Sequence, residues 1–291
     1  MKKSIFKASF EESKNLFKDG MANLQKSQHD KAARNIINGK ATKKFRFTTV
    51  VLALLLPIGF NAFLVSASGA LHSDAAELTV KVSAFRLLTW EVYFGLLAIW
   101  LLFILLGKLL KQNFILPYRY HFHVVIYLII FMIEFILLGI EIASSNINWF
   151  TNTMLVLGIL LPSGFMIYMA PASIRKILYG ETKQDSMRKK VARLIATYGM
   201  GILGLTIIIK NILGFFSIGV SDSWENIGIV AVFVISILFG LGVILYVEFP
   251  YFLQGYYKLK YPEQYRFHER KTIEEWYGKK YLKKHKELLQ K

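Results

Sequence analysis

Six long apolar stretches dominate the sequence and restrict what it can fold into. A helix needs about 20 mostly apolar residues to cross a hydrocarbon layer roughly 30 Å thick, and each stretch is long enough. Lipid offers a peptide backbone no hydrogen-bond partners, so each stretch should be a helix. The expected fold is all-α, a polytopic membrane protein built as a bundle of six transmembrane helices. The predicted spans are Thr48 to Leu71, Leu88 to Gly107, Phe122 to Ala143, Trp149 to Pro171, Leu194 to Val220 and Ile227 to Leu253.

The distribution of charge predicts how these spans are oriented. The chain has 36 Lys and Arg against 19 Asp and Glu, a formal net charge of +17. All but three of the basic residues fall in residues 1–47, 108–121, 172–193 and 254–291. Short loops rich in Lys and Arg stay on the cytoplasmic side, so both the N- and C-termini are predicted to be cytoplasmic. The predicted location is the plasma membrane, taken to be the bacterial cytoplasmic membrane.

Both predicted cytoplasmic ends carry patterns typical of helices. In the basic segment 1–47, apolar residues recur on one side of a helix, which predicts an amphipathic interfacial helix against anionic lipid headgroups. The stripe consists of Phe6, Phe10, Phe17, Met21 and Leu24. A docking helix for a partner protein is the alternative. In the basic tail 254–291, a capping-box pattern at Thr272 to Glu275 predicts a C-terminal helix that extends to about Leu289.

The loop between the fourth and fifth spans is the largest predicted cytoplasmic surface between spans. We expect it to dock a soluble partner, such as a separate ATPase, if the chain has one. Another membrane subunit is a further candidate partner. Nucleic acid is not expected as a partner, because the basic segments carry no interleaved aromatic and basic recognition motif. The candidate docking residues of this loop are Arg175, Lys176, Arg188, Lys189, Lys190 and Arg193.

Ionisable residues inside the predicted spans mark a candidate polar pathway. Each costs about 2.5–3.5 kcal/mol by insertion scales, so each needs a partner, water or a function. Glu134 and Glu141 are two helical turns apart on one face of the third span. Glu91 lies near the outer end of the second span, and Lys210 lies in the outer half of the fifth.

Grouped together, these four residues would carry a net negative charge in a medium of low dielectric constant. The arrangement therefore predicts a retained proton, a bound cation or an acid that reaches water. The alternative is that Glu91 and Glu141 reach the headgroups. Glu134 would then form a single structural ion pair with Lys210.

Prolines inside two predicted spans are candidates for a helix break that shapes a cavity. Pro57 precedes Asn61 in the first span, and Pro162 precedes Gly164 in the fourth. A proline removes an amide donor and frees a carbonyl, which a side chain, water or ligand must satisfy. Broken helices of this kind hold substrates in transporters. The alternative is an ordinary proline kink.

The sequence carries no recognisable catalytic, metal or cofactor motif. It has no cysteine, no histidine in the middle of a span and no phosphate-binding loop. His121 and His123 lie at the inner end of the third span, but no third metal ligand is indicated by spacing. We therefore do not expect an enzyme, a cofactor or a metal site. Energy for any transport would come from an ion gradient or a separate ATPase.

By architecture alone, the chain resembles the permease half of some bacterial ABC exporters. The predicted function is that of a transport or export permease-like component that moves a solute, peptide or lipid with a separate energy source. Two alternatives stay open. One is a non-transporting membrane accessory, assembly or immunity-type protein, and the other is a membrane-embedded lipid-modifying enzyme.

Overall fold

The described part of the chain is all-helical. No β-strand occurs in it, and five of its helical stretches are long and apolar enough to cross a membrane. These helices indicate a multi-pass membrane protein. The computed structural model describes Phe47, Val51 and residues 3–18, 54–73, 83–143, 149–180 and 234–289.

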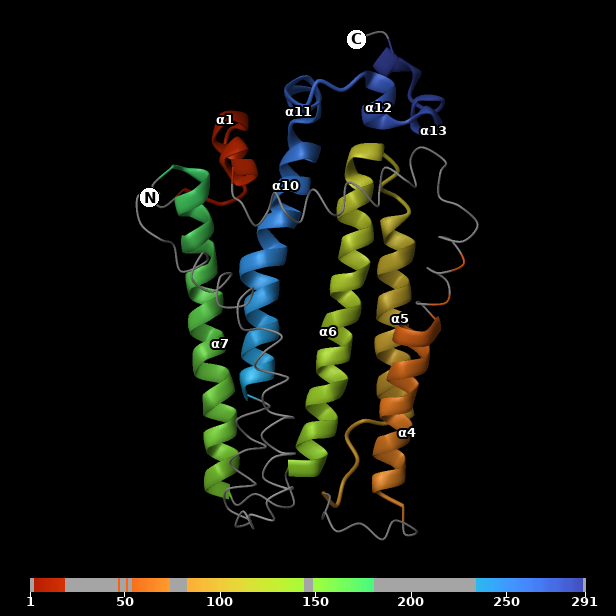
Figure 1. The fold of residues 1–291 in the computed structure, drawn as a ribbon, viewed down its shortest axis with the longest axis vertical. Helices are drawn as coiled ribbons and strands as arrows, with labels where there is room; N and C mark the ends of the chain where they lie inside the picture. Colours follow the sequence, from red (N-terminus) through yellow and green to blue (C-terminus); the bar gives the residue numbers. More distant parts are fainter. Residues whose placement is uncertain are drawn as a thin grey trace, which may run out of the picture.

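The five candidate spans run roughly parallel to one another in Figure 1. Two of them contain a turn of π-helix, η2 and η4, and one follows a short 3-10 turn, η3. In chain order the elements are η2 (Leu54–Phe60) joined to α4 (Asn61–Leu71), α5 (Trp90–Gly107), η3 (Asn113–Ile115) joined to α6 (Leu116–Ala143), α7 (Trp149–Leu178), and the stretch Val234–Lys260 with η4 (Ile244–Glu248) and α10 (Phe249–Lys260).

Helices α4, α5 and α6 pack on one another around a small apolar core. Its buried residues are Leu64 and Val65 of α4, Leu88 just before α5, and Tyr93 of α5. Many large apolar side chains on the outer sides of the helices are exposed. Such a surface fits contact with lipid, which costs an apolar side chain nothing.

A folded cap covers one end of the long helices (Figure 1). The cap consists of residues 3–18 and 261–289, which pack against α10, η3 and α7 around an apolar core rich in tyrosine. We call this end of the bundle the cap end and the opposite end the far end. The helices of the cap are α1 (Phe10–Ser13), α11 (Pro262–His268), α12 (Ile273–Tyr277) and α13 (Lys279–Leu282), with 3-10 turns η1 (Lys14–Lys18) and η5 (Lys286–Leu289).

Tyrosine hydroxyl groups hold residues 3–18 against the C-terminal part of the chain. The Tyr257 hydroxyl donates to the Ile5 carbonyl over 2.6 Å and accepts from the Ala8 amide over 3.1 Å. The hydroxyl groups of Ser13 and Tyr265 are 2.6 Å apart. The two ends of the described chain therefore meet in one cap, and their cytoplasmic location stays a prediction.

The amphipathic segment near the N-terminus is less helical than its periodicity predicts. Within residues 3–18 the α-helix is only α1, and η1 follows it. Phe10 and Phe17 pack on the core of the cap, because α10 and α11 offer them an apolar surface within the chain. Met21 and Leu24 lie outside the described residues. Contact of the segment 1–47 with lipid headgroups stays a prediction.

The predicted tail helix begins where expected and ends early. Both capping-box hydrogen bonds between Thr272 and Glu275 are present at the start of α12. The helix does not continue to Leu289, because Gly278 adopts a φ of 88°. A Cβ atom at Gly278 would lie 2.5 Å from Asn113 Oδ1, so both the backbone and the close contact require glycine.

The long helices extend further at the cap end than the predicted spans. Helix α6 begins at Leu116 rather than Phe122, and α7 continues past Pro171. The last helix ends at Lys260 rather than Leu253. These extensions pack inside the cap, so their length is set by protein contacts as well as by lipid thickness.

At the other boundaries the structure is close to the prediction or does not describe the residues. Helix α5 begins at Trp90, two residues after the predicted start, and the first candidate span is described from Leu54. The predicted fifth span, Leu194 to Val220, lies outside the described residues. The six-helix bundle therefore stays a prediction.

Candidate functional site

Pro57 lies at an irregular turn in the first candidate span. The turn is π-helix η2, and regular α-helix begins only at Asn61. Proline donates no backbone hydrogen bond, which loosens the helical pattern around it. The Tyr93 hydroxyl of α5 donates to the Ile58 carbonyl over 3.1 Å and so fixes this turn against the neighbouring helix.

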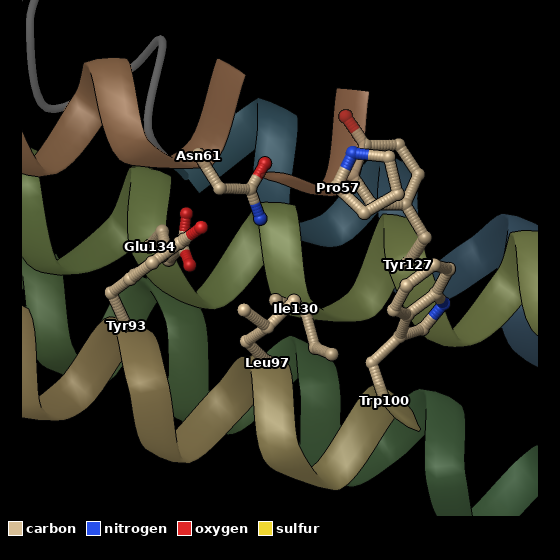
Figure 2. A pocket seen from close by; sticks show the side chains of 8 residues that line it. All are labelled: Pro57, Asn61, Tyr93, Leu97, Trp100, Tyr127, Ile130 and Glu134. Carbon is tan, nitrogen blue, oxygen red and sulfur yellow. The ribbon is translucent and has the colours of Figure 1, made fainter. Parts of the chain in front are cut away.

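A small cavity lies beside this turn, between residues of η2, α4, α5 and α6 (Figure 2). Its volume of about 10 Å³ is close to the room that one water needs. In this conformation the cavity suits a water or a small ion and is too small for a peptide or a lipid. Its lining residues are Pro57, Asn61, Tyr93, Leu97, Trp100, Tyr127, Ile130 and Glu134.

Glu134 is the carboxylic acid in the wall of this cavity. Its side chain is fully buried, and neither carboxyl oxygen has a hydrogen-bond partner among the described residues. The Asn61 side chain lies beside it (Figure 2), and Asn61 Oδ1 is likewise buried without a partner in the described ranges. Burial without a counter-charge disfavours the ionised form of a carboxylic acid. The cavity thus holds an acid and an amide with unused hydrogen-bonding capacity.

Glu141 lies two helical turns from Glu134 along α6 and is also fully buried. Its carboxylate accepts hydrogen bonds from the amides of Leu87 and Leu88 and, over 2.8 Å, from the Ser68 hydroxyl. Glu141 therefore does not reach the headgroups, and it ties the connection before α5 to the far end of α4 and α6.

Arg86 completes this arrangement, although the sequence alone did not single it out. Its Nε donates to the Ser68 hydroxyl and to the Leu88 carbonyl, each over 3.1 Å. One Nη donates to the Val65 carbonyl over 2.7 Å. The available signal was an arginine in a predicted outer loop, where basic residues are few. We call the contacts among Glu141, Ser68, Arg86 and the residue 87 and 88 amides the Glu141 latch.

The other two predicted pathway residues do not join Glu134 in the described structure. Glu91 lies in the first turn of α5 with an exposed side chain, and it does not line the cavity. Lys210 lies outside the described residues. Its predicted ion pair with Glu134 therefore stays a prediction.

The helix break predicted at Pro162 and Gly164 is absent from the structure. Helix α7 continues through both residues to Leu178. A membrane helix tolerates proline where local adjustments satisfy the freed backbone group. A Cβ atom at Gly164 would meet nothing within 4 Å, so the described residues form no close contact there.

The predicted docking loop is described only at its start. Arg175 and Lys176 lie in the last turn of α7, where positive side chains are favourable to the helix dipole. Docking of a partner there stays a prediction. The remaining docking residues lie outside the described structure: Arg188, Lys189, Lys190 and Arg193.

A second buried polar pair lies toward the cap end. The ring of His121 on α6 is hydrogen-bonded to the Glu248 carboxyl group at the end of η4. The Tyr251 ring packs edge-on against His121 with 5.3 Å between ring centroids. The described ranges contain no group of three His, Cys, Asp or Glu arranged to hold a metal. The pair therefore joins α6 to the last helix.

Comparisons with known proteins returned no match. No protein-family model, curated protein or solved structure is similar to this chain.

Proposed function

We propose that the chain is a transport or export component, permease-like in function, that moves a solute, peptide or lipid across a membrane. Energy would come from an ion gradient or from a separate partner such as an ATPase. The main support is Glu134, a buried acid within a candidate span whose oxygens have no partner in the described structure. Acids in spans are costly, and they commonly mark a pathway for an ion or a substrate.

The surroundings of Glu134 favour transport over the two alternatives. In an accessory or assembly protein, a buried acid without a partner would lower the stability of the bundle and would serve no function. A lipid-modifying enzyme needs two convergent catalytic groups beside a space that admits the lipid. The cavity offers a single carboxylic acid and room for about one water.

The size of the cavity limits which solutes can bind beside Glu134. A solute larger than a small ion fits beside Glu134 only in another conformation of the chain. The structure is then a closed state, with the Glu141 latch holding the far end together. The irregular turn at Pro57 is the place where α4 can change direction, because π-helical turns and prolines weaken the regular hydrogen-bond pattern.

An untargeted transport screen tests the proposal. Cells that lack the gene would receive the wild-type chain, Glu134→Gln, Glu91→Gln or an empty vector, and mass spectrometry would compare solutes, peptides and lipids inside and outside. We expect at least one compound to be redistributed by the wild-type chain and by Glu91→Gln. Glu134→Gln should behave like the empty vector. A Glu134→Gln chain that redistributes the same compounds as the wild type would overturn transport through this site.

A further inference from the structure

One face of α6 carries a row of polar side chains through the bundle. Glu141, Glu134 and Tyr127 follow one another at seven-residue intervals, about two helical turns, and His123 lies one turn further toward the cap end. Glu134 and Tyr127 both line the cavity (Figure 2). The four side chains are thus spaced along one face of α6 from the far end toward the cap end.

The members of this row differ in how their polar atoms are satisfied. Glu141 is saturated by the Glu141 latch. The two Glu134 oxygens and His123 Nδ1 are buried and have no hydrogen-bond partner in the described part of the chain. Buried polar atoms nearly always have a hydrogen-bond partner in folded proteins. Unsatisfied polar atoms on one helix face therefore indicate a functional role.

The space between Glu134 and Tyr127 suits a relay through one water. The cavity brings a water-sized volume against both side chains. His123 does not line the cavity, and its ring lies close to Gly107 of α5. The Trp100 indole donates to the His123 carbonyl over 3.3 Å and fixes this turn of α6 against α5. A hydroxyl group can accept one proton and release another, whereas the surrounding apolar side chains cannot.

We propose that Glu134 is a proton-carrying carboxyl group that exchanges its proton by way of the cavity water and Tyr127. In the release step the O–H bond of Glu134 breaks and its proton passes to the water. The water releases a proton to the Tyr127 hydroxyl oxygen, and the proton of that hydroxyl passes to a water outside the cavity. The Glu141 latch closes the route toward the far end. This inference rests on the proposed function and names the proton as the coupling ion.

Neighbouring titratable groups do not hold Glu134 in one charge state. The groups that face it are Tyr93 from α5, Tyr127 from α6 and the neutral amide of Asn61 from α4. Glu141, two turns along α6, and Arg86 are engaged in the latch. Glu134 is therefore able to change its protonation state without breaking an ion pair with a described residue.

Infrared difference spectroscopy on the full chain in proteoliposomes tests this inference. The carbonyl stretch of a protonated acid in an apolar site is separate from that of a carboxylate, so it reports Glu134 directly. We expect a band that disappears as pH rises, shifts in Glu134→Asp, is absent in Glu134→Gln and remains in Glu141→Gln. After a rapid pH jump, Tyr127→Phe should slow the loss of the band by about tenfold, or 1.4 kcal/mol in barrier.

Two results would overturn the proton assignment. One is a Glu134 band that does not change with pH. The other is a band that added Na⁺ or Ca²⁺ removes at constant pH, which would assign a metal cation to the site. Unchanged kinetics in Tyr127→Phe would overturn the route. Each of these outcomes is distinct from failure of the transport screen, because loss of transport in Glu134→Gln does not depend on which ion Glu134 carries.

Discussion

Glu134 is expected to reduce the stability of the folded chain. A buried polar group without a partner costs about 1–3 kcal/mol. Replacing Glu134 by leucine, which is similar in volume and apolar, should therefore raise the free energy of unfolding by about 1–3 kcal/mol and abolish transport. Thermal unfolding in detergent micelles measures the first effect. A lower stability for Glu134→Leu would mean that the carboxyl group has a stabilising partner.

Glu141 should respond in the opposite direction to the same substitution. Glu141→Leu leaves the amides of Leu87 and Leu88 and the Ser68 hydroxyl without their acceptor, at a cost of about 1–3 kcal/mol for each buried donor that stays unpaired. The chain has no native cysteine, so Leu88→Cys provides a single thiol at a fully buried position of the latch. A thiol reagent should modify Leu88→Cys faster in the Glu141→Leu background than in the wild-type background. Equal rates would show that Glu141 does not hold this segment.

The contrast between these two acids shows how far sequence reasoning reaches at single residues. The seven-residue spacing placed Glu134 and Glu141 on one face of one helix, and the structure has them there. Their different surroundings were not predictable, because the latch partners come from α4 and from the connection before α5. The roles of Ser68 and Arg86 depend on tertiary contacts, and the periodicity of a sequence carries no information about such contacts.

The short helices of the cap depend on a glycine where α12 and α13 meet. Gly278→Ala places a side chain at a positive φ, at a cost of about 1–2 kcal/mol, and against Asn113 of η3. We expect faster hydrogen exchange of the amides in α12 and α13. The matched control is Gly164→Ala in α7, where the Cβ meets nothing and alanine favours the helix by about 0.5–1 kcal/mol. Similar effects of the two substitutions would contradict this account.

For whole elements, hydropathy predicted the interiors of the long helices and not their ends. The apolar stretches at α5, α6 and α7 are helices, as expected. Helix α6 starts before its predicted span because Tyr118 is buried in the cap, and α7 continues until Leu178 is buried there too. A scale that describes transfer into lipid has no term for such contacts. The same limit explains why periodicity alone does not predict that Phe10 and Phe17 pack against the core of the cap.

The cap as a whole should loosen at acidic pH. The Ser9 amide lowers the pKa of Glu12, and the Thr272 amide lowers the pKa of Glu275. Because both folded pKa values are depressed, their stabilisation is present above the ordinary glutamate pKa and is lost as pH falls through the lowered values. Protease cleavage of the cap should accelerate over that range. A chain with Glu12→Gln and Glu275→Gln should show a weaker dependence on pH, and an unchanged dependence would exclude the two capping boxes as its cause.

Lys258 connects the cap to the bundle. Its side chain is 4% exposed, and its ammonium group lies 2.8 Å from Glu269 Oε1. It also lies 5.7 Å from the ring centre of Phe17, 5.5 Å from that of Tyr118 and 5.4 Å from that of Trp276. One cation thus joins the N-terminal segment, α6, α10 and α12 by ion pairing and cation–π contacts.

Replacing this cation should separate the cap from the helices without unfolding them. Lys258→Met keeps the length of the side chain and removes both the ion pair with Glu269 and the cation–π contacts, each of which costs about 0.5–2 kcal/mol. We expect protease to release residues 3–18 at least about tenfold faster, a 1.4 kcal/mol change, with the helical circular dichroism retained. Lys280→Met, at an exposed position of α13, should leave the rate unchanged. Equal rates for the two variants would contradict a joining role for Lys258.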